Sequence, residues 1–402
     1  MGESPSIAIE ETRQGRLFLL SLVVAVFAIN PGGIVVSLLL KDMGLTFGVP
    51  VGIMGQISTA SSVVAVVSAL IMGFLSVRFK HKSLLITGLL SLNVSSLGCA
   101  LAPDFNTMLV SYALSGVALV MVSPMAYAMI GEYLPLQKRA GAVSGIVATG
   151  SFAYFVGAPI IALIAGYGSW RTVFPFFVIP VGLAGLLLAF LGVPSKSLQN
   201  QSQTNRRDYF ESFRSILSNR SASACLVGDV LRSIQFTAIL LYAISFFRDR
   251  FSVSIESATI ILLFAALAYT LGSLASGRLV NRFGRKNSTV LTALLAGVFT
   301  ISYAFVPDLW VSIGLNFAAS WFSGMVTVAA NNLTLEQVPT FRGTMMSIDS
   351  AAVNLGSALG AAVGGAALLS LGYAGMGLIL GSVGVAAALI YHLLTTDPCV
   401  RR

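Results

Sequence analysis

The sequence predicts an all-α integral membrane protein with twelve transmembrane helices, arranged as two pseudo-symmetric six-helix halves, and with both termini cytoplasmic. Three observations predict this fold class: an apolar composition, a series of long apolar runs, and a repeat that divides the chain into halves. Of the 402 residues, 56% are hydrophobic and 10% are charged, whereas soluble domains carry about 25% charged residues. The mean hydropathy of +0.88 therefore indicates a polytopic membrane protein.

The individual helices follow from the apolar runs, because a helix needs about 20 apolar residues to cross a bilayer. The first run is too long for the core of a signal peptide, so we expect it to be the first transmembrane helix. In the first half the predicted helices span 17–40, 51–77, 83–102, 106–131, 142–166 and 171–193. In the second half they span 222–247, 257–281, 287–306, 309–334, 343–370 and 373–394.

Polar segments set the predicted domain organisation. A cytoplasmic tail is expected over 1–16, the amino-terminal half over 17–193, the carboxy-terminal half over 222–394, and a second cytoplasmic tail over 395–402. Residues 194–221 are rich in Gln, Asn, Ser and basic residues. We therefore expect them to form a cytoplasmic linker between the halves.

Two landmarks carry the repeat. A basic loop, Gly277 to Lys286, reads G-R-L-V-N-R-F-G-R-K, and a weaker copy, Gly73 to Lys82, reads G-F-L-S-V-R-F-K-H-K. The second landmark is the pair Glu132-x-x-Pro135 and Glu336-x-x-Pro339. In both cases the two copies stand 204 residues apart. Two landmarks at one separation predict a duplicated half of about two hundred residues.

Charge predicts the orientation and excludes some ligands. With the amino terminus inside, 19 of the 24 Lys and Arg residues fall on the inner side and four on the outer side. Because cytoplasmic loops are enriched in Lys and Arg, this bias predicts that both termini are cytoplasmic. The net charge of +9 does not indicate nucleic-acid binding, since the basic residues lie in loops between apolar runs. The three cysteines lie in different segments, so neither a disulfide nor a metal site is expected.

The basic loop resembles the signature of the major facilitator superfamily, which reads roughly G-x-L-x-D-R-x-G-R-K. The second copy matches this pattern at Gly277, Leu279, Arg282, Gly284, Arg285 and Lys286. It departs at Asn281, where the family has Asp, and the first copy matches only at Gly73, Leu75, Arg78 and Lys82. The resemblance implies the fold of that superfamily in the cytoplasmic (inner) membrane, a monomer, and no cofactor. It also implies a small-molecule substrate, bound near mid-membrane and moved by alternating access.

Three charged residues fall inside predicted transmembrane helices, where charge is costly and usually functional. Asp229 and Arg232 are three residues apart on helix 222–247 and share a face, and Asp349 lies on helix 343–370. The trio carries one carboxylate more than its single cation, and desolvation favours the neutral form of a carboxyl. We hypothesise that Asp229 is the proton-coupling acid, with Arg232 as its release partner or as a substrate anchor. The alternatives are an ion pair that pins its helix and, for Asp349, a cytosol-wetted residue near a helix end.

The resemblance implies that helices 17–40, 106–131, 222–247 and 309–334 surround the substrate cavity. Polar and aromatic side chains on these helices are candidates for substrate contact: Asn30, Tyr112, Tyr127, Gln235, Phe236, Trp321, Asn331 and Asn332. Asn30 precedes Pro31-Gly32-Gly33, which breaks the backbone ladder of its helix. The alternatives are a kink with a satisfied amide at Asn30 and plain packing or interface anchoring for the aromatic residues.

The acids that end two of the helices are candidates for a gate. In the superfamily, an acid at this place contacts the basic loop and closes the inward mouth. The resemblance implies that Glu336 engages Arg282 or Arg285, and that Glu132 engages Arg78. Exposed pairs contribute only about 0–1 kcal/mol, which suits a contact that opens in every cycle. The alternative is ordinary interfacial charge.

A second resemblance is to exporters of the drug:proton antiporter group. It rests on the run Glu132-Tyr-Leu-Pro135, on Gly157 and on Trp170-Arg171, and on the small-residue pattern from Gly356 to Gly365. The favoured interpretation of the last pattern alone is generic helix packing. Proton-coupled members usually carry an Arg where this chain has Tyr112. Either coupling has moved to helix 222–247, or the chain is not a proton antiporter.

These observations favour a secondary transporter. No nucleotide-binding loop, metal constellation or catalytic triad occurs in the sequence, so we expect neither an enzyme nor a primary pump. The leading hypothesis is proton-coupled efflux of an amphipathic or drug-like compound. One alternative is a proton-coupled importer of an organic anion or a sugar-like solute. Another is a transporter-like membrane sensor.

Overall fold

The computed structural model describes residues 13–134, 142, 145–146, 149–150, 152–194, 213–339 and 342–398, and all regular secondary structure in this part of the chain is helical. The predictions for the first twelve residues, for Pro135, for most of the linker and for Cys399 lie outside the described residues. The chain forms two compact units. Unit 1 consists of Met1–Leu39 and Val63–Ser202, and unit 2 of Leu40–Ser62 and Gln203–Arg402.

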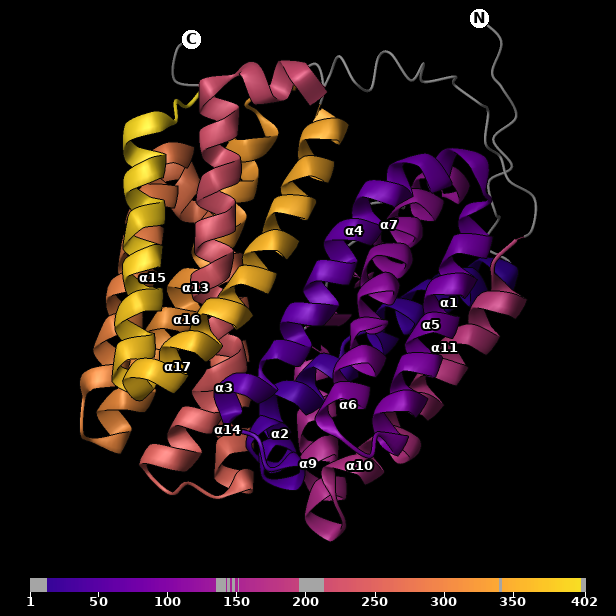
Figure 1. Ribbon diagram of the computed structural model, residues 1–402. Helices are drawn as coiled ribbons and strands as arrows, with labels where there is room; N and C mark the ends of the chain where they lie inside the picture. Colours follow the sequence, from indigo (N-terminus) through magenta and orange to yellow (C-terminus); the bar gives the residue numbers. More distant parts are fainter. Residues whose placement is uncertain are drawn as a thin grey trace, which may run out of the picture. The chain divides into compact units, whose positions relative to one another are not determined.

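Unit 1 contains the helices of the predicted first half. They are α1 (Arg13–Ala28), the start of α2 (Pro31–Phe47), the greater part of α4 (Gln56–Arg78), α5 (His81–Leu101), α6 (Phe105–Ala113), α7 (Ser115–Tyr133), α9 (Ala158–Tyr167), α10 (Trp170–Val173) and α11 (Ile179–Gly192), with wider π turns at Ala153–Gly157 and Phe174–Val178. Figure 1 shows α1, α5 and α11 side by side. Buried Leu, Val, Met and Ala side chains from these helices and α7 form an apolar core.

The predicted break in the first transmembrane helix is confirmed. α1 ends at Ala28 and α2 begins at Pro31, because proline has no N–H to continue the helical ladder. The side-chain amide of Asn30 donates to the carbonyl oxygen of Val26 over 2.9 Å. This bond satisfies a backbone acceptor that the break exposes. A second irregular residue, Leu39 (φ −111°, ψ 15°), lies inside α2 where unit 1 ends.

Unit 2 contains the helices of the predicted second half. They are the short α3 (Val51–Met54), α13 (Arg220–Arg250), α14 (Ile255–Phe283), α15 (Arg285–Phe305), α16 (Leu309–Leu335) and α17 (Arg342–Leu394). α17 has a non-helical residue at Gly372, whose φ of 68° strongly favours glycine. This break separates the predicted helices 343–370 and 373–394. In Figure 1, α13, α15 and α16 lie beside α17.

Charged residues attach the segment Leu40–Ser62 to the rest of unit 2. Asp42 accepts two hydrogen bonds from the guanidinium of Arg248, one of them 2.9 Å long. Lys41 forms an ion pair with Asp249, which also accepts a 2.6 Å bond from the hydroxyl of Tyr373. The two ion pairs are reciprocal, because the segment Leu40–Ser62 and helix α13 each supply one cation and one anion.

The apolar surface fits a lipid environment. In the described part of the chain, ten helical stretches are long and apolar enough to cross a membrane. Their outward faces carry large hydrophobic side chains, for example Leu187 and Phe190 on α11 and Leu274 on α14. In water such patches would be a liability, whereas in a bilayer they contact acyl chains.

Candidate functional site

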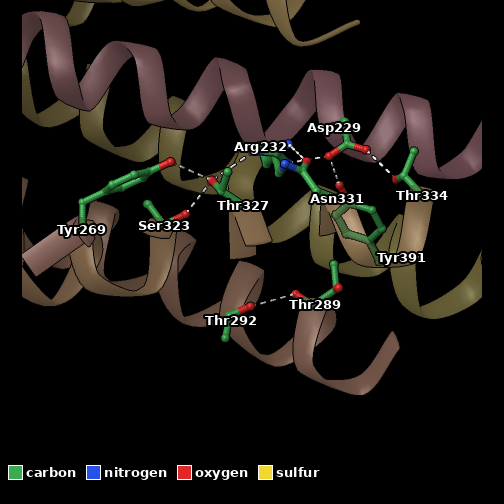
Figure 2. A network of polar contacts seen from close by, with 10 residues as sticks. All are labelled: Asp229, Arg232, Tyr269, Thr289, Thr292, Ser323, Thr327, Asn331, Thr334 and Tyr391. Carbon is green, nitrogen blue, oxygen red and sulfur yellow. Dashed lines mark hydrogen bonds and ion pairs between the residues drawn. The ribbon is translucent and has the colours of Figure 1, made fainter. Parts of the chain in front are cut away.

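A buried charge cluster lies among the helices of unit 2, and Figure 2 shows its polar contacts. Asp229 is fully buried on α13. Its Oδ1 atom accepts hydrogen bonds from Nε of Arg232 and, over 3.0 Å, from the hydroxyl of Tyr391. Its Oδ2 atom accepts a 3.0 Å bond from the hydroxyl of Thr334. The carboxylate thus has three donors from three segments, which stabilises its charged form.

Arg232 connects this carboxylate to a second set of side chains. The guanidinium donates to the hydroxyl of Thr327 over 3.2 Å and to the side-chain oxygen of Asn331 over 3.3 Å. Tyr269 on α14 also donates to Thr327, over 3.2 Å, and its ring stacks on Phe236 with centroids 4.9 Å apart. Among the hydrogen bonds and ion pairs drawn in Figure 2, only those of Arg232 connect the Asp229 carboxylate to Thr327 and Tyr269.

Asp349, on the first part of α17, completes the cluster. It is only 4% exposed. Its carboxyl lies within electrostatic range of Asp229 and Arg232 and within hydrogen-bonding range of the Asp229 carboxyl. Its Oδ1 atom has no hydrogen-bond partner. The structure therefore brings together the three charged residues that the sequence placed inside the membrane.

Small residues explain why these helices come so close. A Cβ atom on Gly356 would lie 2.4 Å from the carbonyl oxygen of Val230, and one on Gly360 would lie 2.7 Å from that of Ile234. α17 thus packs directly on the backbone of α13, as small residues at four-residue spacing allow. On the other side of Asp229, a Cβ on Gly228 would lie 2.5 Å from the ring of Tyr391. Glycine there makes room for the ring whose hydroxyl reaches Asp229.

Two predicted cavity residues of unit 2 are held by the protein itself. Gln235 points toward α15, where its amide donates to the hydroxyl of Thr300 over 2.7 Å. Asn332 donates to the carbonyl of Val328 on its own helix over 2.9 Å. Trp321 is partly buried, and its carbonyl oxygen lies at the close crossing of α14 and α16. Of the predicted set in unit 2, Asn331 and Phe236 join the network of Arg232 and Tyr269.

The predicted cavity residues of unit 1 are separate. Tyr112 is buried at the end of α6, where the helix breaks before α7 begins at Ser115. Tyr127 is more than one-third exposed on α7. The side-chain amide of Asn30 is used by its own helix, as described above. These contacts do not test a role in substrate binding, which stays a prediction.

The basic loop of unit 2 is tied to the end of the chain. Gly284, with φ of 80°, joins α14 to α15, a conformation that favours glycine. The backbone N–H of Arg285 donates to the carboxylate of Asp397 over 3.2 Å, and Lys286 donates to the carbonyl of Thr395 over 2.8 Å. Arg282 lies over the ring of Phe283.

The predicted gate contacts are only partly visible in the described residues. Glu336 ends α16, and its pairing with Arg282 or Arg285 stays a prediction. Glu132 of unit 1 contacts the weaker basic loop through Nδ1 of His81, over 2.8 Å. The sequence named Arg78, three residues earlier, whose side chain is exposed. Gly277, the first residue of the stronger motif, is exposed as well.

Sequence reasoning missed several members of the cluster. Tyr391, Thr334, Thr327 and Tyr269 all bond directly or indirectly to Asp229 or Arg232. A weak signal existed, because hydroxyl side chains in apolar helices tend to bond to buried polar partners. Nothing in the sequence, however, says which of the many hydroxyls faces which helix.

The long apolar helices and the buried charge cluster among them define the class, a polytopic membrane protein with charged side chains in its interior. The chain belongs to the Major Facilitator Superfamily, whose profile matches residues 20–265 and 226–401. The resemblance predicted from the basic loop is thereby confirmed. Members of this family are transporters of small molecules, so the protein is a membrane transporter and not an enzyme.

Individual relatives are distant. YwfA of Bacillus subtilis, an uncharacterised MFS-type transporter, is 26% identical over 377 residues, which cover 92% of this chain and 90% of YwfA. Multidrug resistance protein 2 of the same organism is 25% identical over 334 residues, covering 78% of this chain and 79% of that protein. Among solved structures, a D-xylose-proton symporter matches with a TM-score of 0.79 at 16% identity, covering 95% of this chain and 98% of the symporter. At that identity the likeness shows the fold alone.

Proposed function

We propose that the protein is a secondary active transporter that exports an amphipathic or drug-like compound in exchange for protons. The observation that carries this proposal is the buried cluster of two carboxyls and one guanidinium on α13 and α17. A buried cluster with one carboxyl in excess destabilises a protein inside the bilayer, so its presence indicates a function such as proton binding and release. The similarity to Multidrug resistance protein 2 supports efflux as the direction.

We also propose the predicted topology of twelve transmembrane helices, with a linker at 194–221 and both termini in the cytoplasm of a cell whose inner membrane holds the protein. The stretch Thr344–Leu394 has 51 residues and breaks at Gly372. At about 1.5 Å per residue it is more than twice as long as a bilayer core of about 30 Å is thick. Counting this stretch twice and adding the shorter apolar helix Ala153–Tyr167 to the ten candidate spans supports twelve crossings.

The network supports a mechanism in which Arg232 transmits the protonation state. When the cluster holds one proton, Arg232 is neutralised by one carboxylate and its remaining N–H groups stay with Thr327 and Asn331. When that proton leaves, two carboxylates compete for one guanidinium. Any movement of Arg232 then changes the surroundings of Thr327 and, through it, of Tyr269, which stacks on Phe236. We propose that this aromatic pair contacts an amphipathic substrate.

The test is a vesicle assay with a defined probe. Inside-out vesicles containing the full-length protein would receive an imposed acid interior, reported by a fluorescent pH dye. Addition of ethidium should release protons from the vesicles while ethidium accumulates inside. The variant Asp229→Asn should abolish both signals, whereas Asp104→Asn, at an exposed acid that caps α6 outside the cluster, should keep them. Ethidium accumulation that persists unchanged in Asp229→Asn would contradict proton coupling through this site.

A runner-up function is a proton-coupled importer of an organic anion or a sugar-like solute. It is favoured by the guanidinium of Arg232, whose two terminal nitrogens contact only neutral partners in the described structure. In right-side-out vesicles with an acid exterior, accumulation of benzoate or D-xylose without any response to ethidium would support it. If the protein is a sensor, one of these compounds should raise the melting temperature of the protein, but none should be transported.

A further inference from the structure

The two carboxyls of the charge cluster differ in how many hydrogen-bond donors they face. Asp229 accepts bonds from Arg232, Tyr391 and Thr334. Each of these donors stabilises the carboxylate and is lost or weakened if the group takes up a proton. Asp229 is therefore the carboxyl of the pair with the more hydrogen-bond donors.

Asp349 has the opposite surroundings. It is almost fully buried, and its Oδ1 atom is without a hydrogen-bond partner. An ionised carboxylate in such a place would lack compensation for its lost hydration. The carboxyl also lies within hydrogen-bonding range of Asp229. Since an ionised carboxyl has no proton to donate, two carboxyls can share a hydrogen bond only if one of them is protonated.

Resting on the proton-coupled function above, we propose that the exchanged proton is carried by the Asp349 carboxyl, while Asp229 stays ionised as the counter-ion of Arg232. Thr334 and Tyr391 are then positioning residues, because their hydrogen bonds to the Asp229 carboxylate disfavour its protonation. On release, the O–H bond of Asp349 breaks and the proton passes to water. The electron pair stays on the new carboxylate, which competes with Asp229 for Arg232.

The other groups around Asp349 fit this assignment. α13 contributes Asp229 and Arg232 together with the buried thiol of Cys225, and the second part of α17 contributes Tyr391. α16 faces the pair with the neutral side chains of Thr334 and Asn331. Arg232 is thus the only cation that contacts the acid pair in the described part of the chain. α17 contacts the backbone of α13 directly at Gly356, about two helical turns from Asp349.

Infrared spectroscopy of the full-length protein in lipid membranes tests the assignment, because a protonated carboxyl has a carbonyl stretching band that a carboxylate lacks. We expect such a band at neutral pH, and we expect Asp349→Glu to shift its frequency while Asp229→Glu leaves it in place. Thr334→Val should add a second band, since Asp229 loses a donor and begins to share the proton. A purely structural role for Thr334 would leave the spectrum unchanged. Glu132→Gln serves as the control.

A band that moves with Asp229→Glu but not with Asp349→Glu would overturn the proposal, as would the absence of any protonated carboxyl. If Asp349→Glu does not fold, the spectrum of Asp229→Glu is the test, because an unshifted carboxyl band excludes Asp229 as the proton carrier. The result is separable from the transport assay. Proton exchange with ethidium together with a band on Asp229 would refute only the assignment, whereas a band on Asp349 without transport would refute only the efflux function.

Discussion

The two units contrast in where they keep charge. In unit 1, the buried polar side chains among the described residues are neutral. In unit 2, Asp229, Arg232 and Asp349 are all buried and lie together. The two halves that the repeat predicts have therefore diverged, with the ionisable chemistry concentrated in the second. The stronger copy of the basic loop also lies in that half.

The contrast is that unit 1 buries apolar and neutral side chains, whereas unit 2 also buries a charged network. α7 and its neighbours in unit 1 bury Leu, Val and Met against one another. α13 instead packs on α17 through glycines and leaves room for Tyr391 and Asp349. The following experiments compare matched changes in the two units, from the largest expected effect to the smallest.

The double variant Asp229→Asn, Asp349→Asn should have the largest effect on stability. It leaves Arg232 buried without a carboxylate, and breaking a buried ion pair in this way costs about 3–5 kcal/mol. Each single variant should cost clearly less, because the remaining carboxyl can ionise and pair with Arg232. The measurement is the melting temperature in detergent. If the effects of the two single variants add up to that of the double variant, the two acids act separately. The control is Tyr112→Phe in unit 1, which should change the melting temperature little.

Tyr391→Phe should rank second. It removes a donor from the Asp229 carboxylate, and hydrogen bonds to charged groups contribute about 1.5–3 kcal/mol. The ring and its packing against Gly228 are retained. Tyr127→Phe in unit 1 makes the same chemical change on a partly exposed residue and should be close to neutral. Equal losses of melting temperature for the two variants would remove the contrast between the units.

Gly356→Ala should destabilise unit 2, and Gly157→Ala should be tolerated in unit 1. The new Cβ on residue 356 would lie 2.4 Å from the oxygen of Val230, whereas on residue 157 the nearest atom, in Ile34, is 3.6 Å away. Overpacking costs about 1–3 kcal/mol. Thermal melts of the two variants, read together, test the contact of α13 with α17. A tolerated Gly356→Ala would show that these helices are not in direct backbone contact.

The ion pair of Asp42 with Arg248 should contribute a smaller amount. Both side chains are partly exposed, so a coupling of about 1 kcal/mol or less is expected in a double-mutant cycle. The cycle would use Asp42→Asn, Arg248→Gln and the double variant, with high salt reducing the coupling. Glu132→Gln combined with Arg248→Gln should give additive effects. A coupling of zero at low salt would mean that the pair does not hold the segment Leu40–Ser62 in place.

Asp104 should give the smallest effect, and the size of that effect depends on pH. It caps α6, and bonds from the backbone N–H and the hydroxyl of Thr107 hold the pKa of its carboxyl below the ordinary value of 3.8. A lowered pKa adds stability above the ordinary value, and that stability is lost as the pH falls through the lowered pKa. Asp104→Ala should therefore lower the melting temperature slightly at neutral pH and make less difference in acid. A larger loss in acid would contradict this account.

Sequence patterns predicted most of the fold because the bilayer imposes a simple rule. A helix must be apolar over a fixed length, so most apolar runs in the described part of the chain marked a helix to within a few residues, including the breaks at Asn30-Pro31 and near Gly372. The first run was predicted to end at residue 40, whereas α2 continues to Phe47, and the start of the predicted helix 142–166 lies largely outside the described residues. The apolar runs did not predict where the compact units divide. The packing of Leu40–Ser62 within unit 2 depends on pairs such as Asp42 with Arg248, which are 206 residues apart in sequence.

The charged members of the candidate site were the clearest in the sequence, and Asn331 and Phe236 were the neutral members named beforehand. Charge inside an apolar run is visible in sequence, so Asp229, Arg232 and Asp349 stood out. Their partners Tyr391 and Thr334 did not, because they look like any other residue of an apolar helix. Gln235 was named as a cavity candidate from its residue type and helix, but the sequence did not show that its amide donates to Thr300 on α15.

The central claim is that the charge cluster of unit 2, and not unit 1, exchanges protons for substrate. The most direct measurement is proton release from purified protein in weakly buffered detergent solution when ethidium is added, followed with a pH dye. The account predicts release from the wild type and from Tyr112→Phe, and none from Asp229→Asn or Asp349→Asn. Release that survives in both cluster variants, or that disappears in Tyr112→Phe, would contradict it.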